Sequence, residues 1–249
     1  MSVGNTFVVE RVCPVCGKTT RAVKVRSRLM ALATDCDFCR HYKDFNPYFY
    51  TIWVCEHCAF AGDEKKFSAP LPEKHRQKIQ QFLANRRAKF DFNEVRTLPE
   101  AVASFQLAIF FEELVNSSLG RQAGLYLELA WIYRLAKDTE REIPMLQKAV
   151  NLYEQSILTE RYPIGGLTDT MAIYLVGAIS YLIKDYDKSA TYLSRIISDQ
   201  TLRVTEPQVF EKARYLWQDV RVAKEIAEKE AAEAQQATVP PMVQQTVKG

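Results

Sequence analysis

Long uncharged apolar runs are missing from the sequence. No segment approaches the roughly 18 apolar residues that a membrane helix requires, and the opening residues, MSVGNTFVVERV, lack the basic-then-apolar order of a secretory leader. Gly-rich phosphate loops, nucleophile elbows and HExxH motifs are also lacking. We therefore expect a cytoplasmic protein without membrane contact, and the sequence leans towards a non-enzymatic role while leaving enzymatic activity open.

Neither sign of charge is in large excess. Lys and Arg number 33 against 30 Asp and Glu, which gives a net charge of +3. This total predicts neither an acidic nor a nucleic-acid partner. The 249 residues are 47% apolar, which suffices for a real core in one large or two modest domains.

Cysteine is scarce but concentrated. All six cysteines fall in three CxxC pairs near the start of the chain, namely Cys13/Cys16, Cys36/Cys39 and Cys55/Cys58. In a reducing compartment this pattern indicates metal or redox chemistry rather than disulfides. Spacing alone does not choose among the pairs, because the first with the second and the second with the third both fit zinc-site spacing.

The sequence around each pair favours the outer two. RVCPVCGKTT and WVCEHCAFAG both place a valine before the first cysteine, and Gly17 or Ala59 after the second. A zinc knuckle needs such an apolar strand followed by a tight turn of small residues. TDCDFCRHY has neither. We therefore predict one closed, structural Zn²⁺ site, with iron bound in rubredoxin fashion as an alternative, formed by Cys13, Cys16, Cys55 and Cys58.

Residues 6–62 are predicted to form a β zinc-ribbon domain around this site. TFVVERV and YFYTIWVC are rich in β-branched and aromatic residues, as strands are. Gly17, the Asn46-Pro47 step and Gly62 separate them as turns.

Cys36, Cys39 and His41 in the middle segment have three interpretations. Their side chains could pack locally around the long loop of the ribbon, since a free cysteine behaves as a small apolar residue. They could bind a second metal with a further ligand such as His57 or Asp37.

The third interpretation is thiol redox chemistry, in which a cysteine of lowered pKa beside Arg40 or His41 acts as a nucleophile. A metal-dependent hydrolase would instead need His41 with Asp35 or Asp37 at a second metal ion.

From about Pro72 the pattern becomes helical. Ile79, Phe82 and Leu83 lie on one predicted helical stripe, and Thr97 or Leu98 before Pro99-Glu100 predicts a helix start. Another helix is expected over residues 207–235, and the tail QQATVPPMVQQTVKG has too little apolar surface to fold.

Two later stretches resemble each other. LYLELAWIYRLAKDTEREIPMLQKAVNLY and IYLVGAISYLIKDYDKSATYLSRII each predict a helix with a small residue (Ala130, Gly177), a polar turn and a second helix. This is similar to the tetratricopeptide (TPR) pattern, in which the small residue lets paired helices approach closely. The spacing is 47 residues rather than about 34, because ERYPIGGLTDT is inserted as a loop. The prediction is an α+β protein with a ribbon at 6–62, a TPR-like domain of helical hairpins at 72–220, and a helical extension with a disordered tail at 221–249.

The run from CPVCGK through DCDFCRHYKDFNPYFYTIWVCEHCAFA, followed by degenerate TPR-like helices, resembles a bacterial zinc-ribbon family known as domain of unknown function 2225. The resemblance spans about residues 8–220. It implies a bacterial cytosolic protein and supplies no activity. In that family's pattern the position of Cys39 is usually cysteine, whereas the position of Cys36 is commonly another residue.

These features favour a cytosolic adaptor that binds a protein or peptide through its helical domain and uses zinc for folding. They predict no particular oligomeric state. The alternative is a nucleic-acid-associated ribbon, with aromatic residues 48–50 and Trp53 to stack bases and a basic strand to contact phosphate. Val23 and Val25 alternate with that strand's basic residues, as on a half-buried strand with a solvated face. The basic residues are Arg21, Lys24, Arg26 and Arg28.

Overall fold

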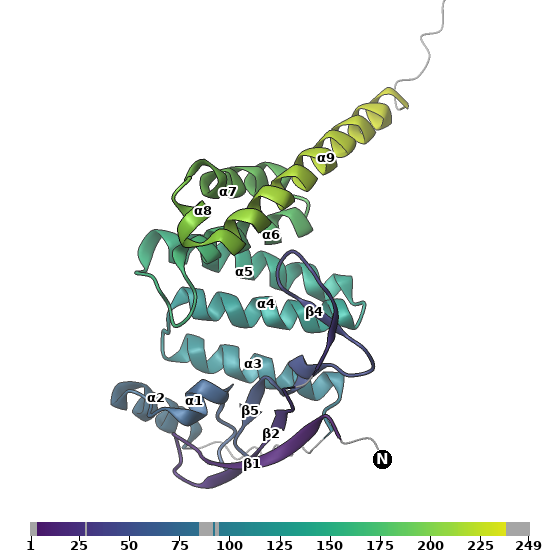
Figure 1. The fold of residues 1–249 in the computed structure, drawn as a ribbon. Helices are drawn as coiled ribbons and strands as arrows, with labels where there is room; N and C mark the ends of the chain where they lie inside the picture. Colours follow the sequence, from purple (N-terminus) through teal and green to yellow (C-terminus); the bar gives the residue numbers. More distant parts are fainter. Residues whose placement is uncertain (1–3, 28, 85–91, 93–94, 238–249) are drawn as a thin grey trace, which may run out of the picture.

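Short antiparallel hairpins form the first part of the chain, and stacked helices form the rest (Figure 1). The computed structural model describes residues 4–27, 29–84, 92 and 95–237. The predicted α+β class is confirmed.

Three two-stranded antiparallel sheets precede the helices. The paired strands are β1 (Thr6–Val12) with β2 (Thr19–Val25), β3 (Ala31–Thr34) with β4 (Arg40–Tyr42), and β5 (Ile52–Val54) with β6 (Ala61–Asp63). The first and third sheets end next to the outer cysteine pairs, while the second is the hairpin that carries the middle pair. We call residues 31–42 the β3–β4 hairpin.

The strand predicted for YFYTIWVC is wrong in its first half. Residues Pro47–Tyr50 form a 3-10 turn, η1, and only Ile52–Val54 is extended. The Asn46 side chain accepts a hydrogen bond of 3.0 Å from the Tyr48 backbone N–H, and Pro47 occupies the first position of the turn. This cap satisfies a backbone donor within the turn itself. It therefore outweighs the strand preference of the aromatic residues.

The helices largely follow the predicted pattern. They are α1 (Glu64–Ser68), α2 (Glu73–Leu83), α3 (Leu98–Leu114), α4 (Leu119–Leu135), α5 (Thr139–Thr159), α6 (Asp169–Leu182), α7 (Tyr186–Ser198), α8 (Leu202–Thr205) and α9 (Pro207–Ala237). The predicted start at Thr97 is confirmed by a capping box with Glu100. The helical pattern predicted to run on from Glu73 continues into residues 85–91, which lie outside the described residues. The predicted disordered tail begins at residue 235, but α9 extends to Ala237, so the prediction is wrong for its first three residues, and the rest of the tail, residues 238–249, lies outside the described residues.

The two predicted helix-turn-helix units form hairpins, α4 with α5 and α6 with α7 (Figure 1). Each turn places a lysine in the left-handed region, Lys137 at φ 61° and Lys184 at φ 64°. The next residue, Asp138 or Asp185, caps the second helix by accepting a backbone hydrogen bond. The shared turn chemistry supports an internal repeat, while the TPR-like assignment and the domain boundaries stay predictions.

Ribbon and helices share one apolar core. Trp53 and Phe60 from the ribbon pack with Phe67 of α1 and with Phe105 and Phe111 of α3, and the Phe60 and Phe111 rings lie 5.4 Å apart. The β3–β4 hairpin leaves this core and rises along the helical stack (Figure 1), where its residues contact α4, α6 and α9. No described helix combines the length and the apolar character that crossing a membrane demands.

Candidate metal centre

Cys13, Cys16, Cys55 and Cys58 come together at the junction of the first and third sheets. Their four Sγ atoms all lie within 4.8 Å of one another. The Cys13–Cys58 and Cys16–Cys55 sulfur pairs are each 3.7 Å apart. A tetrahedron of sulfurs about 2.3 Å from a central Zn²⁺ has edges of about 3.8 Å. The cluster therefore fits one tetrahedral metal ion.

Two equivalent turns place these thiols. In the first, the Cys13 N–H donates to the Lys18 carbonyl and the Gly17 N–H donates to the Cys13 carbonyl, both at 2.9 Å. In the second, Cys55 pairs with Phe60 and Ala59 with Cys55 in the same way, both at 2.8 Å.

Gly17 at φ 72° and Ala59 at φ 63° both adopt the left-handed conformation. Gly17 adopts this conformation without strain because it lacks a Cβ atom, whereas Ala59 adopts it at the cost that any residue with a Cβ atom meets.

The donor set suits zinc, which would be held by four thiolates in a closed site. Cys13 and Cys55 are buried, while Cys16 and Cys58 are half-buried. Hydrogen bonds from Cys13 and then Cys58 lower the pKa of the Cys55 thiol, while hydrogen bonds with Cys13 and then Cys55 raise the pKa of Cys58. A metal ion with four sulfur ligands would have no open position for substrate and would contribute to folding.

The middle cysteines lie elsewhere, in the β3–β4 hairpin. A ligand atom from each of Asp35, Cys39 and His41 lies within 4.8 Å of the other two. Cys36 lies outside this group, since its thiol is 4.0 Å from the Ala178 carbonyl oxygen in α6. Burial, the largest cause, raises the pKa of both Cys36 and Cys39 to about 12. A reactive thiolate at neutral pH is correspondingly disfavoured.

The further ligands considered from sequence have other partners. His57 contacts the Thr19 carbonyl oxygen through Nε2 at 2.8 Å and so joins the two cysteine turns. Asp37 is fully buried and binds Arg134 of α4, and the indole N–H of Trp131 also donates to it. Sequence reasoning missed Arg134 and Trp131, because nothing near them in the chain points to a hairpin about a hundred residues earlier.

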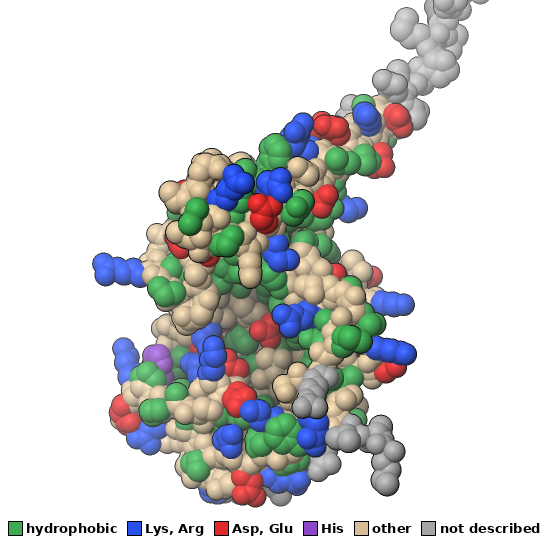
Figure 2. All heavy atoms as spheres, in the orientation of Figure 1, with side chains coloured by type: hydrophobic (Ala, Val, Ile, Leu, Met, Phe, Trp, Pro, Cys, Tyr) green, Lys and Arg blue, Asp and Glu red, His purple; other side chains and the backbone are tan. Residues whose placement is uncertain are grey.

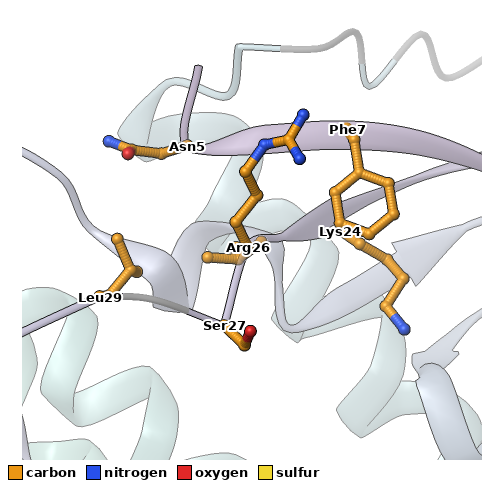
Figure 3. A pocket seen from close by; sticks show the side chains of 7 residues that line it. Asn5, Phe7, Lys24, Arg26, Ser27 and Leu29 are labelled. Atoms are coloured by element: carbon orange, nitrogen blue, oxygen red, sulfur yellow. The ribbon is translucent and has the colours of Figure 1, made fainter. Parts of the chain in front are cut away.

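The predicted nucleic-acid residues have intramolecular partners. Lys24 Nζ lies 2.7 Å from Glu64 Oε1. Arg26 donates to the Gly4 carbonyl at 2.9 Å and lies over the Phe7 ring. Figure 3 shows Lys24, Arg26 and Phe7 along an open pocket formed by β1, β2 and the residues that follow. Arg21 is also engaged, and Arg28 lies outside the described residues.

The fold and the cysteine cluster together define a class of protein in which short antiparallel hairpins around four clustered cysteines precede a body of helical hairpins. The chain belongs to the bacterial family described as an uncharacterized protein conserved in bacteria, domain of unknown function 2225, whose model matches residues 8–220. No curated protein and no solved structure matches the chain.

Proposed function

We propose that this protein is a cytosolic, non-enzymatic adaptor that binds a protein or peptide partner through its helices. In this proposal the ribbon holds one structural Zn²⁺ ion and fixes one end of the helical stack. The support comes from the closed four-cysteine geometry and from the two helical hairpins, which build the kind of extended surface that repeat proteins use for binding.

The observation that carries the proposal is an apolar stripe on α9. Tyr215, Val222 and Ile226 are 58%, 57% and 51% exposed. Their spacing of seven and then four residues places them on one face of the helix. We call these three residues the α9 stripe.

The opposite face of α9 is already occupied. Residues Val209, Phe210, Ala213, Leu216 and Val220 are buried against α6 and α7. The distal half of α9 projects from the body with apolar and charged side chains mixed along it (Figures 1 and 2). An amphipathic helix of a partner suits such a stripe, because its apolar residues would cover the stripe while its polar residues pair with the flanking charges.

A stripe variant tests the proposal. Tagged wild-type protein and the triple variant Tyr215→Ser, Val222→Ser, Ile226→Ser would be purified from bacterial cells, together with Leu158→Ser as a matched control. Leu158 is 82% exposed at the end of α5 and is not part of the stripe.

We expect wild type and the Leu158 variant to enrich the same partner and the stripe variant to lose it. With purified partner, the Kd should rise about tenfold or more, since each large buried interface residue contributes on the order of 1–2 kcal/mol. Equal binding by the stripe variant would refute the proposed surface. Turnover of a substrate by the purified protein would refute the adaptor role.

A further inference from the structure

The β3–β4 hairpin brings a carboxylate, a thiol and an imidazole to one point. Asp35 follows β3, Cys39 precedes β4, and His41 lies within β4. The His41 Nε2 atom is 2.9 Å from each Asp35 carboxylate oxygen. The Cys39 sulfur completes a group whose ligand atoms all lie within 4.8 Å of one another. These three side chains supply the oxygen, sulfur and nitrogen ligands that zinc accepts.

The turn between the strands is held in a fixed form. The Asp35 N–H donates to the Cys39 carbonyl at 2.8 Å, and the Phe38 N–H donates to the Asp35 carbonyl at 3.0 Å. Phe38 has φ 71°, which costs a non-glycine residue about 1–2 kcal/mol. Packing compensates for this strain, because the Phe38 ring lies 5.4 Å from that of Tyr174 in α6. The ligand group is therefore preorganised.

The surroundings carry more negative than positive charge. Arg134 binds three carboxylates, those of Asp35, Asp37 and Glu142, at 2.7–2.9 Å. One guanidinium thus faces three carboxylates, a formal surplus of two negative charges in a site where Asp37 is fully buried. Buried charge needs compensation, and a divalent cation would offset part of the surplus, since a Zn²⁺ ion with a Cys39 thiolate changes the formal charge of the site from −2 to −1.

Arg134 also orients the carboxylate ligand. Its guanidinium NH1 holds the Asp35 Oδ2 atom at 2.9 Å. The His41 Nε2 atom lies 2.9 Å from this Oδ2 atom and also 2.9 Å from Oδ1, so Arg134 and His41 hold the same carboxylate. Contacts of this kind around a ligand are typical of metal sites, in which the outer groups set ligand orientation.

We propose that Asp35, Cys39 and His41 bind a second Zn²⁺ ion, separate from the four-cysteine site. Binding breaks the Asp35–His41 hydrogen bond, in which Nε2 carries the imidazole proton. For coordination through Nε2, this proton is given up to solvent while Nδ1 takes one from solvent, and the Cys39 thiol releases its own proton, so that the metal gains one thiolate, one carboxylate and one neutral imidazole. Three protein ligands leave the fourth tetrahedral position to water. Asp35 and His41 are half-buried and reach solvent, whereas Cys39 is fully buried beneath them. The proposal does not depend on the adaptor function.

Zinc titration of the full-length protein, read by native mass spectrometry, tests this site. Cys36→Ser is the matched control, because Cys36 lies in the same turn but outside the ligand group. We expect two zinc ions per chain in wild type and in Cys36→Ser, and one in Cys39→Ser. The ion retained in the four-cysteine site reports that the Cys39 variant is still folded around it.

Two further measurements distinguish coordination from loss of structure. His41→Gln and Asp35→Asn keep the side-chain shape approximately. Each should raise the Kd of the second zinc ion about tenfold or more. On loading with Co²⁺, the second equivalent should add about one quarter of the thiolate charge-transfer absorption of the first, since one sulfur replaces four. One zinc ion per chain in wild type at saturating Zn²⁺, or equal loss of the second ion in Cys36→Ser, would overturn the proposal.

Discussion

Arg134 and Asp37 form a bidentate ion pair that links α4 to the β3–β4 hairpin, although the two residues are 97 positions apart in the sequence. Both contacts are 2.9 Å long, from NH1 to Oδ1 and from NH2 to Oδ2. Trp131 donates to the same carboxylate from one helical turn away. The hairpin is thereby attached to the helical stack by polar contacts as well as by packing.

Removal of the guanidinium should destabilise the protein strongly. Arg134→Ala leaves the buried Asp37 carboxylate with only the Trp131 indole N–H and a backbone N–H as donors. We expect the free energy of unfolding to fall by about 3–5 kcal/mol, the usual effect of leaving a buried charge unpaired. Urea titration followed by tryptophan fluorescence measures this.

The control is Arg141→Ala, which breaks an exposed pair with Asp138 and should change stability little. An Arg134 variant as stable as the Arg141 variant would contradict the assigned role.

Loss of the four-cysteine metal should unfold the ribbon. Cys55→Ser removes a fully buried ligand, and the adjacent Ile52 and Trp53 would lose the turn that orders them. Structural zinc commonly contributes about 10 kcal/mol or more to the folding of small metal domains. We expect one metal fewer per chain and a red-shifted tryptophan emission, measured by elemental analysis and fluorescence. Unchanged metal content in this variant would argue against the site.

Local chemistry made the cysteine turns and the helical hairpins predictable. The choice of the outer pairs followed from residues beside each cysteine, above all Gly17 and Ala59, and the left-handed φ at both positions gives the reason. The turns at Lys137-Asp138 and Lys184-Asp185 were likewise readable from polar residues between apolar helices.

The middle hairpin was not predictable in the same way. Its structure depends on residues far along the chain, because Arg134 binds its carboxylates and the Tyr174 hydroxyl donates to the Cys36 carbonyl. Sequence reasoning grouped Cys36 with Cys39 by their spacing. In the folded chain the Cys36 thiol faces α6, and Asp35 occupies the third place in the ligand group.

Gly177 should tolerate no side chain. A Cβ atom there would lie 2.7 Å from Cγ of the buried Leu193, across the α6–α7 contact. We expect Gly177→Ala to destabilise the protein by about 1–3 kcal/mol through overpacking, as measured by thermal unfolding. Gly124→Ala in α4 is the matched control, since its Cβ would meet no atom closer than 3.6 Å.

The control should be neutral, or up to about 1 kcal/mol more stable than wild type from helix propensity. Equal effects of the two substitutions would show that close approach of α6 and α7 is not the constraint.

Glu128 in α4 should make stability depend on pH. Burial first, and then the charge of Asp63, raises the pKa of Glu128 to about 7, although Arg121 opposes the shift. A carboxyl group whose pKa is raised by folding favours the folded state when protonated. The stabilising contribution of protonated Glu128 to the free energy of unfolding is therefore fully present below about pH 4.5, and it is lost as the pH rises through about 7.

Glu128→Gln removes this titration. We expect the variant to be about 1–3 kcal/mol more stable than wild type at pH 8, with a smaller difference at pH 5, in urea titrations at each pH. Glu230→Gln, at an exposed position on α9, should leave the pH dependence unchanged. A constant difference between the Glu128 variant and wild type across this range would exclude titration of Glu128 as the cause.

The distance in sequence between the β3–β4 hairpin and its partners sets an order of events during synthesis. The ribbon cysteines are complete once Cys58 has left the ribosome, so the metal site can close early. The hairpin must wait for Arg134 in α4 and Tyr174 in α6. Because N-terminal segments emerge first, the four cysteines can come together while the apolar face of the ribbon still awaits α3, and the hairpin stays undocked until most of the helical stack has been made.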